Sequence, residues 1–122
     1  DMMEFPKDFN LWEGSATMFE IGVYSSCDSQ IRIVSPYESS FDLYAVKNNG
    51  TPGSCPSNLD VLSHYDKVSY SNRGRAGLNL EEGLWCVVVH ARTGSGSVYV
   101  TADNDCKISG PKTPLISHSK FI

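Results

Sequence analysis

The sequence predicts an all-β fold, a jelly-roll-like antiparallel β-sandwich of about seven to eight strands, over residues 16–106. Three observations support this prediction. Short apolar runs alternate with polar residues at a period of two, as in strands that bury one face. Clusters of Gly, Pro, Asn and Ser separate these runs and supply turns. No stretch has the apolar periodicity of a long amphipathic helix.

The two ends of the chain lie outside this predicted sandwich. Residues 1–15 are acidic and lack a regular period, so we expect an N-terminal arm that Phe5, Phe9 or Trp12 pins to the body. Residues 107–122 contain prolines and serines without a period, and we expect a tail or linker. The last two residues of the chain are apolar, which indicates docking on this chain or on a neighbouring copy.

Three strands are expected in the first half of the domain, at residues 16–23, 30–34 and 40–46. A loop rich in Asn, Gly and Pro follows at residues 47–57, and residues 57–66 have room for one short helical turn. Alternation assigns the following side chains to the core: Phe19, Ile21, Val23, Ile31, Ile33, Phe41, Leu43 and Ala45.

The second half of the domain begins with two short strands, at residues 67–71 and 76–80. The densest block of β-branched and aromatic residues comes next, at residues 83–91, and an alternating run at residues 97–102 follows a Gly-Ser-Gly turn. We expect these two runs to form a β-hairpin. Alternation places Trp85, Val87, Val89 and Ala91 on the core face, and Cys86, Val88 and His90 on the opposite face.

Composition limits the classes of partner. The 122 residues carry a formal net charge of −4 and no basic run, which argues against a nucleic-acid partner. No apolar run approaches 18 residues, so no membrane span is expected. The chain opens on Asp1, which is typical of a mature or excised segment.

The four cysteines predict two disulfides and hence an oxidising, extracellular compartment, because they are even in number and lack zinc-site spacing. The sequon at Asn49 agrees with secretion. If the strands at 30–34 and 40–46 are neighbours, and the last two strands form a hairpin, the preferred pairs are Cys27–Cys55 and Cys86–Cys106. Four cysteines allow three pairings, so the other two stay open.

Catalytic residue patterns are missing from the sequence. His64, His90 and His118 fall in unrelated segments, and no Gly-x-Ser-x-Gly elbow lies between a strand and a helix. We therefore expect a protein that is not an enzyme and that has no catalytic residues.

Outward-facing aromatic and apolar residues suggest a binding surface. Tyr44, Tyr99 and Val88 are expected to point away from the core, and Val34 with them. Tyrosine is favoured at recognition surfaces because it combines contact area with a hydroxyl. Such a row would grip a fibrous protein or stack on sugar rings. The alternative is that the arm or the tail covers this face.

The strand motifs, in their order along the chain, resemble a known family. They are Phe19-x-Ile21, Ile31-x-Ile33, Phe41-Asp42-Leu43-Tyr44, Tyr70-Ser71-Asn72, the run from Gly83 to Val89 and the run from Gly94 to Val100. This pattern resembles the bacterial and archaeal pre-peptidase C-terminal (PPC) domains, jelly-roll sandwiches attached to secreted proteases and other exported proteins. The collagen-binding domains of clostridial collagenases are similar to them. The resemblance covers roughly residues 16–103 and implies an accessory domain without catalytic activity.

Calcium is the one cofactor that we consider. In domains like these, calcium ties down a leading segment or a loop, and oxygen-rich loops suit its six to eight ligands. Asp103 and Asp105, with one acid from the arm, are the first ligands to try. The alternative is a solvated acidic rim. Asp42 is expected instead to accept hydrogen bonds from loop amides.

The sequence therefore predicts a secreted, non-catalytic accessory or binding domain. Its partner would be a protein or an extracellular polymer, collagen-like or polysaccharide, or an attached exported enzyme. Two alternatives remain: an extracellular structural subunit that self-associates, with its tail as an added strand in a neighbour, and a carbohydrate-binding module.

Overall fold

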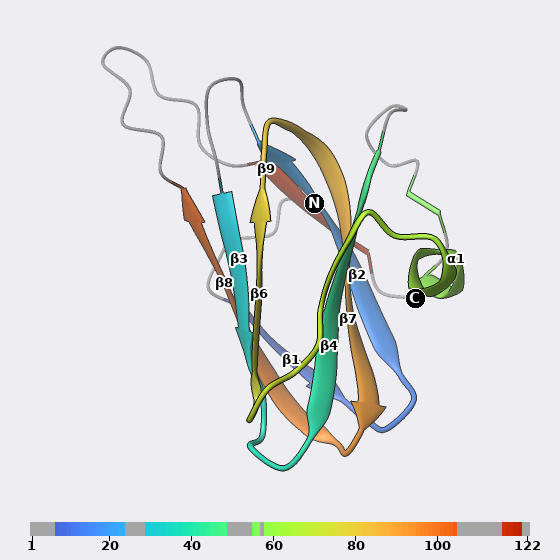
Figure 1. The fold of residues 1–122 in the computed structure, drawn as a ribbon, viewed down its shortest axis with the longest axis vertical. Coiled ribbons are helices and arrows are strands. Elements are labelled where there is room, and N and C mark those ends of the chain that lie inside the picture. Colours follow the sequence, from blue (N-terminus) through green and yellow to red (C-terminus); the bar gives the residue numbers. More distant parts are fainter. Residues whose placement is uncertain (1–6, 24–28, 49–54, 57, 105–115, 121–122) are drawn as a thin grey trace.

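The protein is an all-β sandwich, as the sequence predicts, with one short helix (Figure 1). The computed structural model describes residues 7–23, 29–48, 55–56, 58–104 and 116–120. Its elements are β1 (Lys7–Leu11), β2 (Ala16–Val23), β3 (Ser29–Val34), β4 (Ser40–Lys47), α1 (Asn58–Ser63), β5 (Lys67–Ser69), β6 (Arg75–Leu80), β7 (Gly83–Thr93), β8 (Gly96–Asn104) and β9 (Ile116–Lys120).

The strand order is that of a jelly roll. The four-stranded sheet has the order β1-β8-β3-β6, and the five-stranded sheet has the order β5-β4-β7-β2-β9. All strand pairs are antiparallel. Strands that follow one another in the chain mostly alternate between the sheets, and the first eight strands wind as the two Greek keys of this fold. Strand β9 extends the five-stranded sheet beyond β2.

The predicted hairpin between the last two long strands is wrong. Strand β7 pairs with β2 and β4, whereas β8 pairs with β1 and β3 in the other sheet. Gly94, at φ +80°, turns the chain from one sheet into the other, and a Cβ there would lie 2.8 Å from the Ser39 Cβ. Each run has one apolar side. Its alternation therefore fits two strands in opposite sheets as well as it fits two strands paired in a hairpin.

The core predicted from alternation is confirmed. The main apolar cluster lies between the sheets and includes all eight side chains assigned from the first three strands, together with Trp85, Val87, Val89 and Ala91. The register aligns Phe19, Val87 and Ala45 in one row across three strands. Phe9 stacks against Phe19, with ring centroids 6.1 Å apart.

Two segments outside residues 16–106 also form strands. Strand β1 lies within the expected arm and pairs with β8, because Phe9 and Leu11 alternate with polar residues and bury themselves in the core. Of the three alternatives for the residue that pins the arm, Phe9 is buried, Trp12 is 70% exposed and Phe5 lies outside the described residues. Strand β9 lies within the expected tail and pairs with β2. An added edge strand is held by main-chain hydrogen bonds and needs no strong apolar pattern.

The described part of the chain contains no helix with the length and hydropathy of a membrane span. Its one helix, α1, has six residues.

Candidate binding face

The outer face of the five-stranded sheet is covered by the chain between β4 and β5. This segment carries α1, which lies on the side of that sheet away from the four-stranded sheet (Figure 1). Beneath it is a second apolar cluster, distinct from the main core. Its buried members are Met18, Tyr44, Val61, Cys86 and Val88. We call this side of the molecule the covered face.

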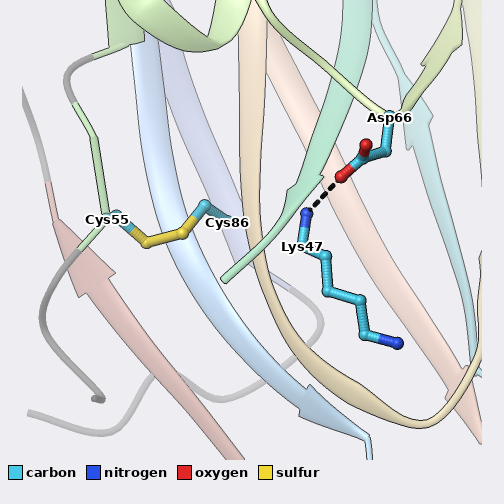
Figure 2. The surroundings of a disulfide bond; sticks show 4 residues. All are labelled: Lys47, Cys55, Asp66 and Cys86. Carbon is cyan, nitrogen blue, oxygen red and sulfur yellow. Dashed lines mark hydrogen bonds between the residues drawn. A yellow bond between two sulfur atoms is a disulfide. The ribbon is translucent and has the colours of Figure 1, made fainter. Parts of the chain in front are cut away.

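A disulfide and two hydrogen bonds hold the covering segment in place. Figure 2 shows the disulfide and the hydrogen bond between Lys47 and Asp66. Cys55, in the loop, is bonded to Cys86, which is fully buried on the outer side of β7. At the other end of the segment, the Lys47 amide donates to the Asp66 carboxylate at 2.7 Å. The Asp66 amide in turn donates to the Ala45 carbonyl at 2.9 Å.

The Cys55–Cys86 bond shows that the preferred pairs Cys27–Cys55 and Cys86–Cys106 are wrong. That preference assumed that β3 is next to β4 and that β7 forms a hairpin with β8. In the structure, β3 and β4 lie in different sheets, and so do β7 and β8. Cys86 instead lies on β7, the strand next to β4, opposite Val46. Cys27 and Cys106 lie outside the described residues.

The predicted binding surface is not formed as expected. Tyr44 is only 7% exposed and Val88 is fully buried, because both lie on the covered face. Tyr99 and Val34 are exposed as predicted, at 41% and 40% respectively, but they belong to the other sheet. The covering segment is neither the arm nor the tail, and periodicity alone could not identify it.

Three tyrosines meet at the rim of the covered face. Tyr44 contacts Tyr65 and Tyr70 edge-on, with ring centroids 5.2 and 6.4 Å apart. Burial raises the pKa of Tyr44, and Asp42 and Tyr65 add to that increase while Arg92 opposes it. A hydrogen bond with Tyr65 is the main cause that raises the pKa of Tyr70. The Tyr44 and Tyr70 phenols are therefore neutral at physiological pH.

Asp42 is a structural anchor, as predicted. Its carboxylate is fully buried and accepts from the Ser71 amide at 2.8 Å and from the Arg92 guanidinium at 2.6 Å. The hydrogen bond to Asp42 is the main cause that raises the pKa of Arg92. His90 is opposite Asp42 on β7, and burial lowers its pKa. The group ties β4, β7 and the chain after β5 together.

The outer face of the four-stranded sheet differs from the covered face, because most of its outward side chains are exposed. We call it the open face. One row runs across it from Asp8 through Tyr99 and Val34 to Arg75. The next row aligns Thr101, Arg32 and Gly77.

A groove of about 470 Å³ lies at the β6 side of the open face. Its apolar and aromatic contributions come from Val34 and Tyr70, and its charges come from Arg32 and Arg75. The lining residues are Gln30, Arg32, Ile33, Val34, Ser69, Tyr70, Asn72, Arg75, Ala76 and Gly77. None of these described residues is acidic, although acidic residues outnumber basic ones in the whole chain by 14 to 10.

The turn that carries Arg75 into the groove is held rigidly. Asn72 and Arg75 exchange main-chain hydrogen bonds, and the Gly74 carbonyl accepts from the Ser35 amide at 2.7 Å. Gly74 has φ +80°, and a Cβ at this position would lie 2.4 Å from the Ser35 carbonyl oxygen. Only glycine fits this close approach. These contacts therefore fix the backbone at Arg75 without a bound ligand.

A smaller crevice of about 320 Å³ lies on the opposite side of the molecule, between β1 and the start of β2. Phe9, Leu11, Trp12 and Thr17 are among its lining residues. The Thr17 hydroxyl is buried and has no hydrogen-bond partner among the described residues. Neither arginine nor lysine lines this crevice.

The predicted calcium ligands lie at the end of β8 and beyond it. Asp103 is in β8 opposite Gln30, and Asp105 lies outside the described residues. The described residues contain no group of three or more His, Cys, Asp or Glu side chains placed to hold a metal ion.

The three histidines are separated by the fold. His64 is exposed just after α1, His90 is half-buried beside Asp42, and His118 is opposite Glu20 in β9. They occupy different strands or segments rather than one site.

The groove itself was missed by sequence reasoning. Arg32 and Arg75 are separated by 43 positions, and only the β3–β6 register places them on one face. The signal that was present is the Asn72-Arg73-Gly74-Arg75 turn, which joins two arginines to a left-handed glycine. Comparison with known proteins finds no family model that matches the chain and no match among curated proteins.

Proposed function

We propose that this protein is a secreted, non-catalytic β-sandwich module that binds an extracellular polymer through its open face. The observation that carries the proposal is the contrast between the two outer faces. One is sealed by α1 and a disulfide, whereas the other exposes Tyr99, Val34 and a groove. Exposed aromatic and apolar groups beside a hollow are typical of recognition surfaces.

An extracellular location is supported by the Cys55–Cys86 disulfide, since such bonds persist mainly in oxidising compartments. The non-catalytic role is supported by how the described polar groups are used. The buried carboxylate of Asp42 is engaged by Arg92 and Ser71, and the imidazole beside it has its pKa lowered by burial. The resemblance to pre-peptidase C-terminal domains adds the role of an accessory module attached to an exported protein.

A polysaccharide is the polymer that the groove favours over a fibrous protein. Tyr70 is 57% exposed at its rim and provides a ring for stacking on a sugar. Gln30, Asn72 and Ser69 add neutral hydrogen-bonding groups suited to hydroxyls. The carbohydrate-binding alternative therefore becomes the specific form of the proposal.

The test is retention of the purified protein on a panel of immobilised polymers: cellulose, chitin, xylan, pectin and collagen. We expect retention on at least one polysaccharide, and we expect Tyr99→Ala to weaken it severalfold. Trp12→Ala is the matched control, because Trp12 is also exposed but lies beside the opposite crevice. Retention on none of the polysaccharides, or equal loss in both variants, would contradict the proposal.

A further inference from the structure

We infer that the open-face groove binds a polysaccharide that carries carboxylate groups. This inference rests on the proposed function and adds the charge class of the ligand. The Arg32 and Arg75 guanidinium groups line the same groove, and no Asp or Glu is among the lining residues whose side chains the structure describes. Arginine recognises carboxylates through paired, charge-assisted hydrogen bonds, so the groove complements an anionic ligand.

The position of Arg75 makes it the principal contact. No hydrogen bond or ion pair joins its side chain to another residue in the described ranges. Asp8 is the acidic residue of the same row, but it lies three strands away, about 14 Å at the usual strand spacing. The charge of Arg75 is therefore available to a ligand.

Arg32 provides a second positive charge at a fixed offset. Arg75 is opposite Val34 and Gly77 is opposite Arg32, so the two arginines are diagonal neighbours, about 7–8 Å apart at the backbone. The Nε of Arg32 donates to the Gln30 side-chain oxygen at 2.8 Å, and its Nη2 donates to the same oxygen. This contact orients the Arg32 guanidinium, and the Gly74 turn fixes the backbone at Arg75, so the ordering entropy of binding comes mainly from the Arg75 side chain.

The main-chain groups along the outer edge of β6 argue against a peptide strand as the ligand of the groove. The Gly77 amide donates to the Ser69 hydroxyl at 3.1 Å, and the Asn79 carbonyl accepts from the Lys67 ammonium at 2.7 Å. Two main-chain groups that an added strand would use are therefore already engaged by side chains of the neighbouring segment. Recognition at this groove must then proceed through side chains, as it does for sugars.

The experiment compares two polymers that share one backbone. Polygalacturonate carries a free carboxylate on each sugar, and fully methyl-esterified polygalacturonan carries none. Affinity electrophoresis of the intact chain should show binding to polygalacturonate at least tenfold tighter than to the ester. Arg75→Gln should remove about tenfold of that affinity. Arg73→Gln, an exposed arginine of the same turn that does not line the groove, should keep most of it.

The outcomes are distinct. Equal affinity for the two polymers, or equal loss in the Arg75 and Arg73 variants, overturns the charge class and leaves the polysaccharide-binding proposal intact. Binding to neither polymer, with no retention on any other polysaccharide of the panel, removes the proposed function itself. A thermal melt of Arg75→Gln within 2–3 °C of the parent, expected for an exposed substitution, shows that its loss of affinity is not a loss of fold.

Discussion

Arg92 is the only described side chain that neutralises the Asp42 carboxylate by direct contact. Asp42 has no exposure, whereas the Arg92 side chain is about half-exposed. Removing Asp42 and removing Arg92 therefore have different effects on stability. An unpaired Arg92 still reaches water, but an unpaired Asp42 remains buried and loses its counter-charge.

We predict that Arg92→Met lowers the free energy of unfolding by about 2 kcal/mol at pH 7, because a buried charge is left without its partner. Urea denaturation measures this change. Arg73→Met is the matched control, since that arginine is exposed and forms no ion pair with a carboxylate among the described residues. A loss below about 0.5 kcal/mol for Arg92→Met would show that Asp42 does not depend on this ion pair.

The partial burial of His90 leads us to predict that the stability of the protein depends on pH. Burial lowers its pKa in the folded state, Asp42 opposes that effect and Arg92 adds to it. The unfolded chain therefore binds the proton first as the pH falls below about 6.5. The stabilisation from the neutral imidazole is complete above that pH and is lost as the pH approaches the lowered folded pKa.

We expect the unfolding free energy of His90→Gln to fall less than that of the parent between pH 7.5 and pH 5. Denaturant titrations at several pH values test this expectation. His64→Gln, at the exposed histidine after α1, controls for the loss of any histidine. Parallel pH profiles for the parent and His90→Gln would contradict the account.

Two glycines with similar φ angles allow the cost of an unfavourable backbone angle to be distinguished from the cost of a steric clash. Gly74 has φ +80° and no room for a Cβ, whereas Gly14 has φ +87° and no atom within 4 Å of the Cβ position. We predict that Gly14→Ala costs about 1–2 kcal/mol from its φ angle alone. Gly74→Ala should cost more, because it must also displace the Ser35 carbonyl. Equal losses, measured by thermal unfolding, would mean that the turn relaxes freely.

At this scale, the sequence predicts which residues face the core but not which residues meet. Alternation identifies Phe19, Leu43 and Val87 as core residues because burial acts on each strand separately. The Asp42–Arg92 pair joins positions 50 residues apart and depends on the β4–β7 register. Nothing local to either residue specifies that register.

The element that most alters the surface is the segment that carries α1. A six-residue helix has little stability of its own, so its place depends on Val61 in the apolar cluster and on the Cys55–Cys86 bond. These contacts convert an apolar outer face into a second small core. They also leave the open face as the surface available for binding.

We predict that Cys55→Ala destabilises the protein by about 3–4 kcal/mol, the chain-entropy value for a bond that spans 31 residues. It should also speed hydrogen exchange in α1 more than in β3. Pro56→Ala, an exposed change beside the bond, is the control. If Cys55→Ala and Pro56→Ala unfold at the same denaturant concentration, the disulfide does not secure the segment.

At the scale of elements, most strands are predictable and their partners are not. Strand β2 spans the predicted residues 16–23, and six further strands agree within a few residues at each end. Strands β1 and β9 were missed because edge strands show a weaker apolar pattern. The false hairpin arose because chain proximity favours pairing, whereas a jelly roll sends β7 and β8 to opposite sheets.

The strand pairing across the whole molecule leads to a prediction about the two remaining cysteines, Cys27 and Cys106. Strands β3 and β8 are paired up to Ser29 and Asn104. If the same register continued by two residues, Cys27 would lie opposite Cys106, and the Cys55–Cys86 bond leaves these two cysteines to pair with each other. Opposed residues of antiparallel strands are about 4.5–5.5 Å apart, within the range that a disulfide spans.

We therefore expect peptide mapping without reduction to recover a Cys27–Cys106 linked peptide beside the Cys55–Cys86 one. Mapping after reduction is the control. Free thiols at positions 27 and 106 in the purified, unreduced protein would show that the register does not continue.

The candidate site could be predicted only in part. The sequence identified Tyr99 and Val34 as outward-facing, and both lie on the open face. Arg32, Tyr70 and Arg75 come together only when β3, β6 and the chain after β5 are assembled. A surface built from three separate segments has no local signature, so it becomes visible only in the assembled fold.

The most direct test of the account is to locate the bound ligand by NMR. A ¹⁵N-labelled sample titrated with short oligogalacturonates should show amide shift changes concentrated in residues 30–34, 69–77 and 97–101, around the groove and the open face. Changes centred on α1 or on the crevice beside Trp12, or no changes at millimolar ligand, would contradict the claim that the open face is the binding face.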